Sequence, residues 1–229
     1  MRNYYLKLKH VVAPLLGAMF IFAGLCGSPV TASARDAFIP GSGGSVQVGE
    51  QTAFPFTPGS TGFWRFETSN NIGCDPFLRL DDDSGNTIAE DDDGGGGLNA
   101  LIVAYLVEGK RYTIHAEFVD VEGGGYTLQV TKMGIPDAIS AGDTAVSGHT
   151  MFTFTPESSG EWTIRTLDNV DCDPMLWLYD ESGNLIAMDD DSGGDLNALI
   201  TAHLEQGEQY IIRAGFFGPQ GTYTLRVEK

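Results

Sequence analysis

The sequence predicts an all-β protein made of two tandem jelly-roll β-sandwich domains after a signal peptide. Three observations support the fold class: the chain matches itself after a shift of 98 residues, apolar and polar side chains alternate with a period of two, and turn-forming residues separate the short alternating runs. A period of two is that of a β-strand, and about eight such runs per copy suit a sandwich of two sheets. We therefore expect two domains built alike.

The N-terminus has the pattern of an export signal. Residues 1–34 contain three basic residues, an apolar run at 11–25 and the small-residue site Ala32-Ser33-Ala34, so we expect cleavage after Ala34 and a secreted or periplasmic protein. Pro14 and several glycines interrupt the apolar run, and no other segment is apolar enough to cross a membrane. We therefore expect no stable membrane insertion after cleavage. Residues 35–44 are rich in glycine and serine and are expected to form a flexible lead-in.

The repeat places the two domains. Residues 52–116 align with residues 150–214 without a gap, and a deletion of one residue near Gly218 extends the match to the last strand of each copy. A solenoid unit has only about 20 to 50 residues, so each copy should be a complete domain. We place the first module at residues 45–132, a linker at 133–142 and the second module at 143–229.

Alternating side chains predict the strands inside each copy. Trp64 and Phe66 alternate with Arg65 and Glu67, and the second copy repeats this pattern around Trp162. Glycine, aspartate, asparagine and proline cluster between such runs, as they do in tight turns. One face of each strand should therefore be buried.

The charge of the chain excludes one class of partner. The net charge is −18, and without residues 1–34 the chain keeps 10 basic residues against 31 acidic ones, a net charge of −21. Such a surface repels the phosphates of nucleic acid and attracts cations, so no nucleic-acid partner is expected.

The order of motifs resembles a known family. In the second copy, Asp-Pro-Met-Leu-Trp-Leu-Tyr-Asp-Glu-Ser-Gly-Asn at 173–184 precedes three aspartates at 189–191, Leu-Asn-Ala-Leu-Ile at 196–200 and Gly-Thr-Tyr-Thr-Leu-Arg-Val at 221–227. This order resembles tandem bacterial pre-peptidase C-terminal domains, which are similar to the collagen-binding domains of clostridial collagenases. The resemblance implies a jelly-roll accessory module, usually carried beside a secreted peptidase, often calcium-binding and without catalysis of its own. No peptidase domain occurs in this sequence, so a peptidase is expected only as a separate partner.

An acidic, glycine-rich loop in each copy is the candidate metal site. Hard cations such as Ca²⁺ take six to eight oxygen ligands, and flexible glycine-rich turns let backbone carbonyls contribute. Asp81 is left out because the second copy has Tyr179 at its position. The alternative is a solvated acidic turn whose residues serve only turn geometry. The predicted calcium ligands are Asp75, Asp91, Asp93 and Asn99 with Asp173, Asp189, Asp191 and Asn197, followed by Asp92 and Asp190.

Catalysis is not expected. The sequence contains neither a G-x-S-x-G motif nor an H-E-x-x-H motif, and His115, His149 and His203 do not recur between the copies. Each of these histidines is expected on the polar face of a strand. The aspartates lie in polar loops, whereas catalytic acids usually lie in apolar pockets that raise their pKa.

Two further residue pairs have open interpretations. Phe77 and Trp177 alternate with leucines, so they are either exposed aromatics for a glycan or protein ligand, or buried by a second layer. Cys74 and Cys172 are equivalent in the repeat, and either form a disulfide between the modules or remain two buried thiols.

These expectations together describe an exported, non-catalytic, calcium-binding accessory or adhesion protein. The alternatives are a cell-surface or matrix module that binds glycan or protein without metal, and an accessory subunit of a secreted peptidase. The expected partners are accordingly an extracellular protein, a polysaccharide or a secreted peptidase.

Overall fold

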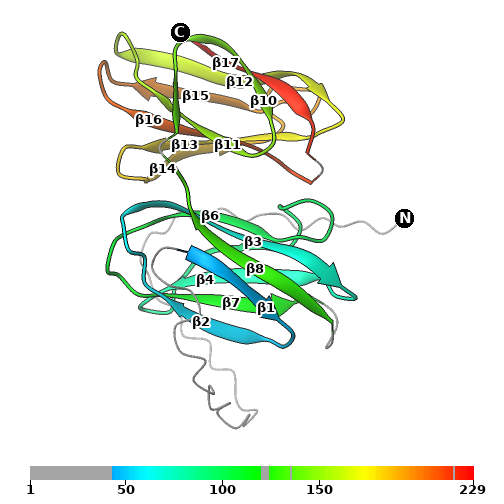
Figure 1. The fold of residues 1–229 in the computed structure, drawn as a ribbon. Coiled ribbons are helices and arrows are strands. Elements are labelled where there is room, and N and C mark those ends of the chain that lie inside the picture. Colours follow the sequence, from blue (N-terminus) through cyan, green and yellow to red (C-terminus); the bar gives the residue numbers. More distant parts are fainter. Residues whose placement is uncertain (1–42, 120–123, 135, 219) are drawn as a thin grey trace, which may run out of the picture. The chain divides into compact units, whose positions relative to one another are not determined.

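The computed structural model describes residues 43–119, 124–134, 136–218 and 220–229, which belong to one compact unit (Figure 1). These residues form strands and turns and no helix, which confirms the predicted all-β fold class. A membrane-spanning helix is accordingly not found in the described ranges. The predicted signal peptide and most of the predicted lead-in lie outside the described residues, although Gly43 and Gly44 of that lead-in begin the first strand.

The first sandwich has eight antiparallel strands in two sheets of four (Figure 1). The sheet orders are β1-β8-β3-β6 and β2-β7-β4-β5, so most chain neighbours lie in different sheets, as in a jelly roll, and β4 and β5 form a hairpin within one sheet. The strands are β1 (Gly43–Val48), β2 (Thr52–Phe56), β3 (Gly62–Ile72), β4 (Pro76–Asp82), β5 (Thr87–Asp91), β6 (Leu101–Leu106), β7 (Tyr112–Phe118) and β8 (Gly125–Lys132).

The second sandwich repeats this topology with the sheet orders β10-β17-β12-β15 and β14-β13-β16-β11-β9. Its extra strand β9 (Asp137–Ile139) pairs in parallel with β11 and lies inside the segment predicted to be a linker. Three residues are too short for the alternating pattern to reveal a strand. The other strands are β10 (Gly142–Ser147), β11 (Thr150–Phe154), β12 (Gly160–Val170), β13 (Pro174–Asp180), β14 (Leu185–Asp189), β15 (Leu199–Leu204), β16 (Tyr210–Phe216) and β17 (Thr222–Glu228).

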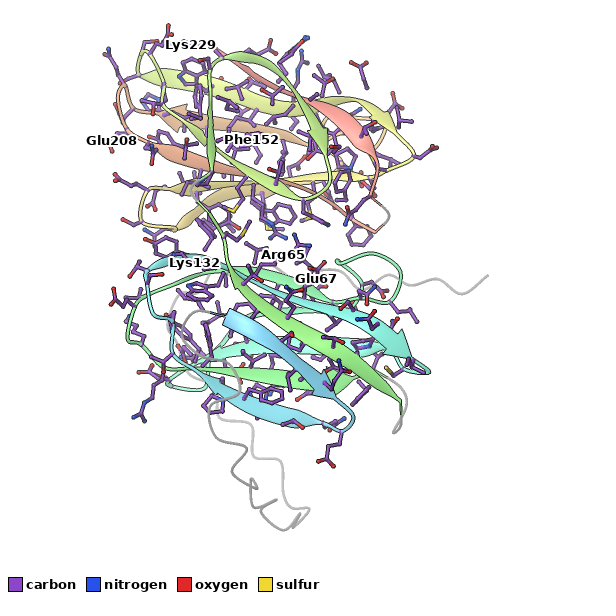
Figure 2. The ribbon with its side chains drawn as sticks, in the orientation of Figure 1. Arg65, Glu67, Lys132, Phe152, Glu208 and Lys229 are labelled. Carbon is purple, nitrogen blue, oxygen red and sulfur yellow. The ribbon has the colours of Figure 1, made fainter. Side chains whose placement is uncertain are left out.

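Each sandwich has its own apolar core between its two sheets. Trp64 and Phe66 of β3 are fully buried, whereas Arg65 and Glu67 project from the outer face of the same strand and pair at 2.6 Å (Figure 2). In the second sandwich, Trp162 is buried at the position of Trp64. The indole nitrogen of each tryptophan donates a hydrogen bond to a serine carbonyl, so its one polar group is satisfied.

A bulge bends the third strand of each copy. The pairing of β3 with β8 shifts between Ser69 and Ile72, and Asn70 has a φ of 54°. In the second copy, Asp168 takes the equivalent position with a φ of 52°. Asparagine and aspartate adopt the left-handed conformation more readily than most residues, so the sequence suits the bulge. Within the bulge, Asn71 donates to the Leu98 carbonyl and Asn169 to the Asp195 carbonyl, so each bulge contacts the acidic loop of its own copy.

Cys74 and Cys172 are free thiols, so the structure contains no disulfide between them and the two-thiol alternative holds. The Cys74 Sγ atom donates to the Gly125 carbonyl at 3.3 Å, and the Cys172 Sγ atom lies 3.6 Å from the Thr222 carbonyl. Each thiol therefore contacts the first residues of the last strand of its own sandwich.

Candidate metal-binding loops

The acidic loop of each copy connects the fifth strand to the sixth, at residues 92–100 and 190–198. In the second copy, the Gly193 amide donates to the Asn197 carbonyl at 2.7 Å, and the Asn197 amide donates to the Gly194 carbonyl at 3.0 Å. The first copy has the same hydrogen bonds between Gly95, Gly96 and Asn99. Both loops are therefore ordered turns built alike.

The first aspartate of each triplet holds the loop together. The Asp91 Oδ2 atom accepts hydrogen bonds from the amides of Gly94 and Leu101, both at 2.8 Å, and Asp189 accepts from Ser192 and Leu199. Burial raises the pKa of Asp91 to about 6, although these two backbone hydrogen bonds lower it. Two of the predicted metal ligands, Asp91 and Asp189, thus already stabilise the backbone of the turn.

The asparagine that follows each triplet differs between the copies. The Nδ2 atoms of Asn99 and Asn197 each donate to a loop carbonyl at 3.0 Å. The Asn197 Oδ1 atom accepts from Thr166 at 3.2 Å and Asn169 at 3.3 Å. The Asn99 Oδ1 atom is buried and has no hydrogen-bond partner among the described residues. Of the two predicted amide ligands, Asn99 therefore has the more available oxygen.

Asp173 lies close enough to the acidic loop of the second copy to feel the charges of Asp191 and Asp190. Its Oδ1 atom is buried and has no hydrogen-bond partner within the described part of the chain. Burial raises the pKa of Asp173 to about 6, and the charges of Asp191 and Asp190 raise it further. Three predicted ligands, Asp173, Asp190 and Asp191, thus repel one another across a partly desolvated space.

In the first copy, the predicted ligands differ in their exposure. Asp92 and Asp93 are exposed, and burial and the neighbouring Asp92 raise the pKa of Asp93. Asp75 is half-buried, and its backbone carbonyl accepts a hydrogen bond from Val119 at 2.9 Å. Among the described residues of both copies, no group of three or more His, Cys, Asp or Glu side chains is arranged to hold a metal ion. A bound cation would therefore need oxygens from backbone carbonyls, an amide or water as well.

A buried threonine, which is not among the predicted site residues, anchors each loop. The Thr68 Oγ1 atom accepts from the Ala100 amide at 2.8 Å, and Thr166 accepts from Ala198 at 2.9 Å. Both threonines are about 1% exposed. The available signal was a polar residue on the inward face of the third strand, at the same position in both copies.

Three exposed apolar side chains accompany each acidic loop, and none of them is among the predicted site residues. Their segments meet at the loop, since Asn71 donates to the Leu98 carbonyl and the Phe217 amide donates to the Asp173 carbonyl. Ile72 is 75% exposed and Phe217 is 59% exposed. The signal was apolar residues in loops at equivalent positions: Ile72, Leu98 and Val119 in the first copy, and Val170, Leu196 and Phe217 in the second.

A second polar site lies on the outer face of β4 and β7, in the first copy alone. The buried Asp81 carboxylate contacts His115 Nε2 at 2.9 Å and Arg79 Nε at 3.3 Å, and accepts from Thr87 at 3.0 Å. A groove of about 410 Å³ opens beside it. The lining residues are Asp81, Asp82, Asp83, Gly85, Arg111, Thr113 and His115.

Two of the three histidines and both members of the Phe77–Trp177 pair are more buried than surface residues usually are. His203 is exposed as expected, but His115 and His149 are half-buried. Burial lowers the pKa of His149 to about 4, with Arg213 and Arg65 lowering it further. Phe77 and Trp177 are also half-buried, and Arg213 stacks on the Trp177 ring at 3.9 Å. Trp177 is therefore not a free exposed platform for a glycan.

Comparisons with known proteins give weak similarities. No protein-family model matches the sequence, and no curated protein matches it. The pre-peptidase C-terminal domain of a collagenase from Bacillus anthracis is 20% identical and covers 42% of this chain and 100% of that domain, with a TM-score of 0.36. The CUB1-EGF-CUB2 domains of rat MASP-1 are 8% identical over 81% of this chain and 97% of theirs, with a TM-score of 0.27.

A tandem carbohydrate-binding structure is similarly distant. The CBM22-1-CBM22-2 tandem domain of Xyn10C from Paenibacillus barcinonensis is 10% identical over 80% of this chain and 86% of its own, with a TM-score of 0.24. These similarities are too weak to assign a family or a function to the chain.

Proposed function

We propose that the chain is an exported, non-catalytic accessory or adhesion protein whose two modules bind Ca²⁺ at their acidic loops. We propose further that each module is a pre-peptidase C-terminal-like domain, because the order of its motifs and its jelly-roll topology support this. The observation that carries the calcium proposal is the Asp173 carboxylate, which has a buried, unpartnered oxygen beside the charges of Asp190 and Asp191.

A divalent cation would relieve the cost of this arrangement. Carboxylates that are both desolvated and close to one another are held in an unfavourable ionised state, and a cation offsets both effects. Ca²⁺ suits the donors because it accepts carboxylate, amide and carbonyl oxygens in a flexible geometry. Asp173, Asp190 and Asp191 would hold the ion in the second copy, with Asp75, Asp93 and Asn99 in the first.

The adhesive surface in this proposal is the loop end of each module. Exposed apolar residues on a loop that carries several carboxylates are unusual, because the carboxylates oppose desolvation by a partner. Neutralising the acidic loop with Ca²⁺ would let the apolar side chains, such as Leu196 and Phe217, contact a partner. The partner would be an extracellular protein, a polysaccharide or a secreted peptidase.

Calorimetric titration of the mature protein with Ca²⁺ tests the proposal. We expect up to two sites with dissociation constants of about 10⁻⁴ to 10⁻³ M, the range of extracellular modules. Saturation at 100 times the dissociation constant should stabilise the fold by about 2.7 kcal/mol per site and raise the melting temperature. Asp191→Ala should remove the site of the second module, and Asp93→Ala that of the first.

Glu208→Ala is the matched control, because it removes one exposed carboxylate from the turn after β15, away from the acidic loop (Figure 2). It should leave both sites intact. Absence of binding heat together with an unchanged melting temperature would reject the calcium proposal. Asp91 and Asp189 are poor test positions, because their loss would weaken the turn without any metal.

A further inference from the structure

We propose that the two sandwiches dock on each other through one outer sheet face each, and that the chain works as a single rigid body. The faces are the outer side of β1-β8-β3-β6 in the first sandwich and of β14-β13-β16-β11 in the second. This inference is independent of calcium binding. Each apolar face is covered by the other module of the same chain.

Contacts between the two faces form a third cluster of buried residues, separate from the two sandwich cores. Phe63 of β3 is buried together with Met151, Tyr179 and Ile211 from the second sandwich. The rings of Phe63 and Tyr179 meet edge to face with their centroids 5.1 Å apart. Val103, Tyr105, Met133 and Trp177 pack around this cluster. Edge-to-face pairs of this kind add to the free energy of apolar burial.

A cation beside this cluster, Arg213, is held by its neighbours. The Arg213 guanidinium stacks over the Trp177 ring at 3.9 Å and hydrogen-bonds with the side chain of Tyr179. A stacked, hydrogen-bonded guanidinium tolerates partial burial better than an ammonium group, because it is more weakly hydrated. Arg213 therefore fits a docked face.

The repeat supplies independent support, because the two copies differ on these faces in a complementary way. Where one copy has large apolar side chains on its docking face, the other copy has polar or smaller side chains at most of the equivalent positions. The residues of the two sandwich cores, in contrast, are similar in both copies. Random surface drift would not confine the apolar residues to the two faces that meet. In the first sandwich, Phe63, Val103 and Tyr105 correspond to Glu161, Thr201 and His203, and in the second, Met151, Tyr179 and Ile211 correspond to Ala53, Asp81 and Thr113.

The same comparison explains why docking stops at two modules. The two faces belong to non-equivalent sheets, so the packing is head to tail and would continue indefinitely if every module were alike. Glu161 and His203 on one free face are exposed, and the opposite free face carries the Asp81–His115 pair. These polar faces close the ends of the pair.

A double-mutant cycle tests the contact at its edge. A Cβ atom on Gly183 would overlap the ring of Tyr105, whereas one on the equivalent Gly85 has no neighbour within 4 Å. The two glycines have φ values of 79° and 81°, so Gly→Ala causes the same backbone strain at both. We expect Gly183→Ala to lower the folding equilibrium constant of the full mature chain about tenfold more than Gly85→Ala.

Truncation of the neighbour should remove that excess. In a Tyr105→Ala background, Gly183→Ala should have the same effect as Gly85→Ala, and Gly85→Ala should be additive with Tyr105→Ala. Equal losses for the two glycine variants, with additivity in both cycles, would overturn the docking.

Chemical-shift mapping gives a second readout. Phe63→Glu, which installs the residue of the second copy, should shift the amide resonances of Tyr179 and Ile211 in the other sandwich. Changes restricted to the first sandwich would contradict the proposal. If Phe63→Glu does not fold, Tyr105→His serves the same purpose, and the glycine cycle needs neither variant.

Discussion

Thr68 and Thr166 decide how the acidic loops are held. Each is a polar side chain on the inward face of a strand, and each satisfies the amide of the residue that ends a loop. A buried amide without a partner costs about 1 to 3 kcal/mol, more than a typical hydrogen bond contributes. Thr166 also donates to Asn197, so it orders both the backbone and one predicted ligand.

We predict that Thr166→Val destabilises the second module by about 1 to 3 kcal/mol, because the Ala198 amide loses its acceptor while the side-chain volume is kept. Denaturant unfolding measures the effect. Thr163→Val is the control, since Thr163 lies on the outer face of the same strand, whereas the Ala198 amide donates to Thr166 on the inner face. Equal losses for both variants would show that the anchor is unimportant.

At the scale of elements, the last strand of each sandwich passes close to the bulge of the third strand, and a glycine lies at the point of contact. A Cβ atom on Gly221 would overlap the Val170 carbonyl and lie 2.8 Å from the Cys172 Cβ atom. Gly124 has the same close approach to Ile72 and Cys74 in the first copy. The entry to the last strand therefore requires a residue without a side chain, so that it can pass the bulge that contacts the acidic loop.

Gly221→Ala should destabilise the protein by about 1 to 3 kcal/mol, because the added methyl group displaces β17 from the bulge of β12. Thermal unfolding measures the change. Gly134→Ala is the control, because Gly134 has nothing within 4 Å of an added Cβ atom. It should be neutral or slightly stabilising. A harmless Gly221→Ala would mean that the bulge yields easily.

At the scale of the whole molecule, groups with shifted pKa values give opposing pH dependences. The pKa of His149 is lowered to about 4, so between pH 4 and 6.5 the unfolded chain binds a proton at this residue that the folded chain does not. Stability therefore falls as the pH drops through this window. Asp91 and Asp173 have raised pKa values of about 6 and act in the opposite direction.

His149→Gln isolates the histidine contribution, because glutamine is the residue at this position in the first copy. Relative to this variant, the native protein should lose stability on the order of 2 kcal/mol between pH 6.5 and pH 4. Urea unfolding at several pH values measures the difference. His203→Gln, at an exposed histidine of the same module, controls for the loss of an imidazole. A constant difference across the range would refute the assignment.

Residue patterns alone predict the all-β fold class, the jelly-roll type and the inward faces of the strands. These features depend on local alternation and on a repeat that is visible without coordinates, as at Trp64 and Trp162. The sequence also singled out the acidic loops and Asp173 as candidates, because the two copies can be compared residue by residue. The calcium itself stays a prediction.

Long-range packing determines how the polar atoms of those loops are used and what covers the outer faces. Whether Asp91 serves a metal or two amides depends on where Leu101 lies, and whether Trp177 is exposed depends on residues distant in the chain. The three-residue strand β9, the His115–Asp81 pair and the burial of His149 depend on the same kind of long-range contact. Side-chain alternation reports which face of a strand is apolar, but it does not report which surface that face meets.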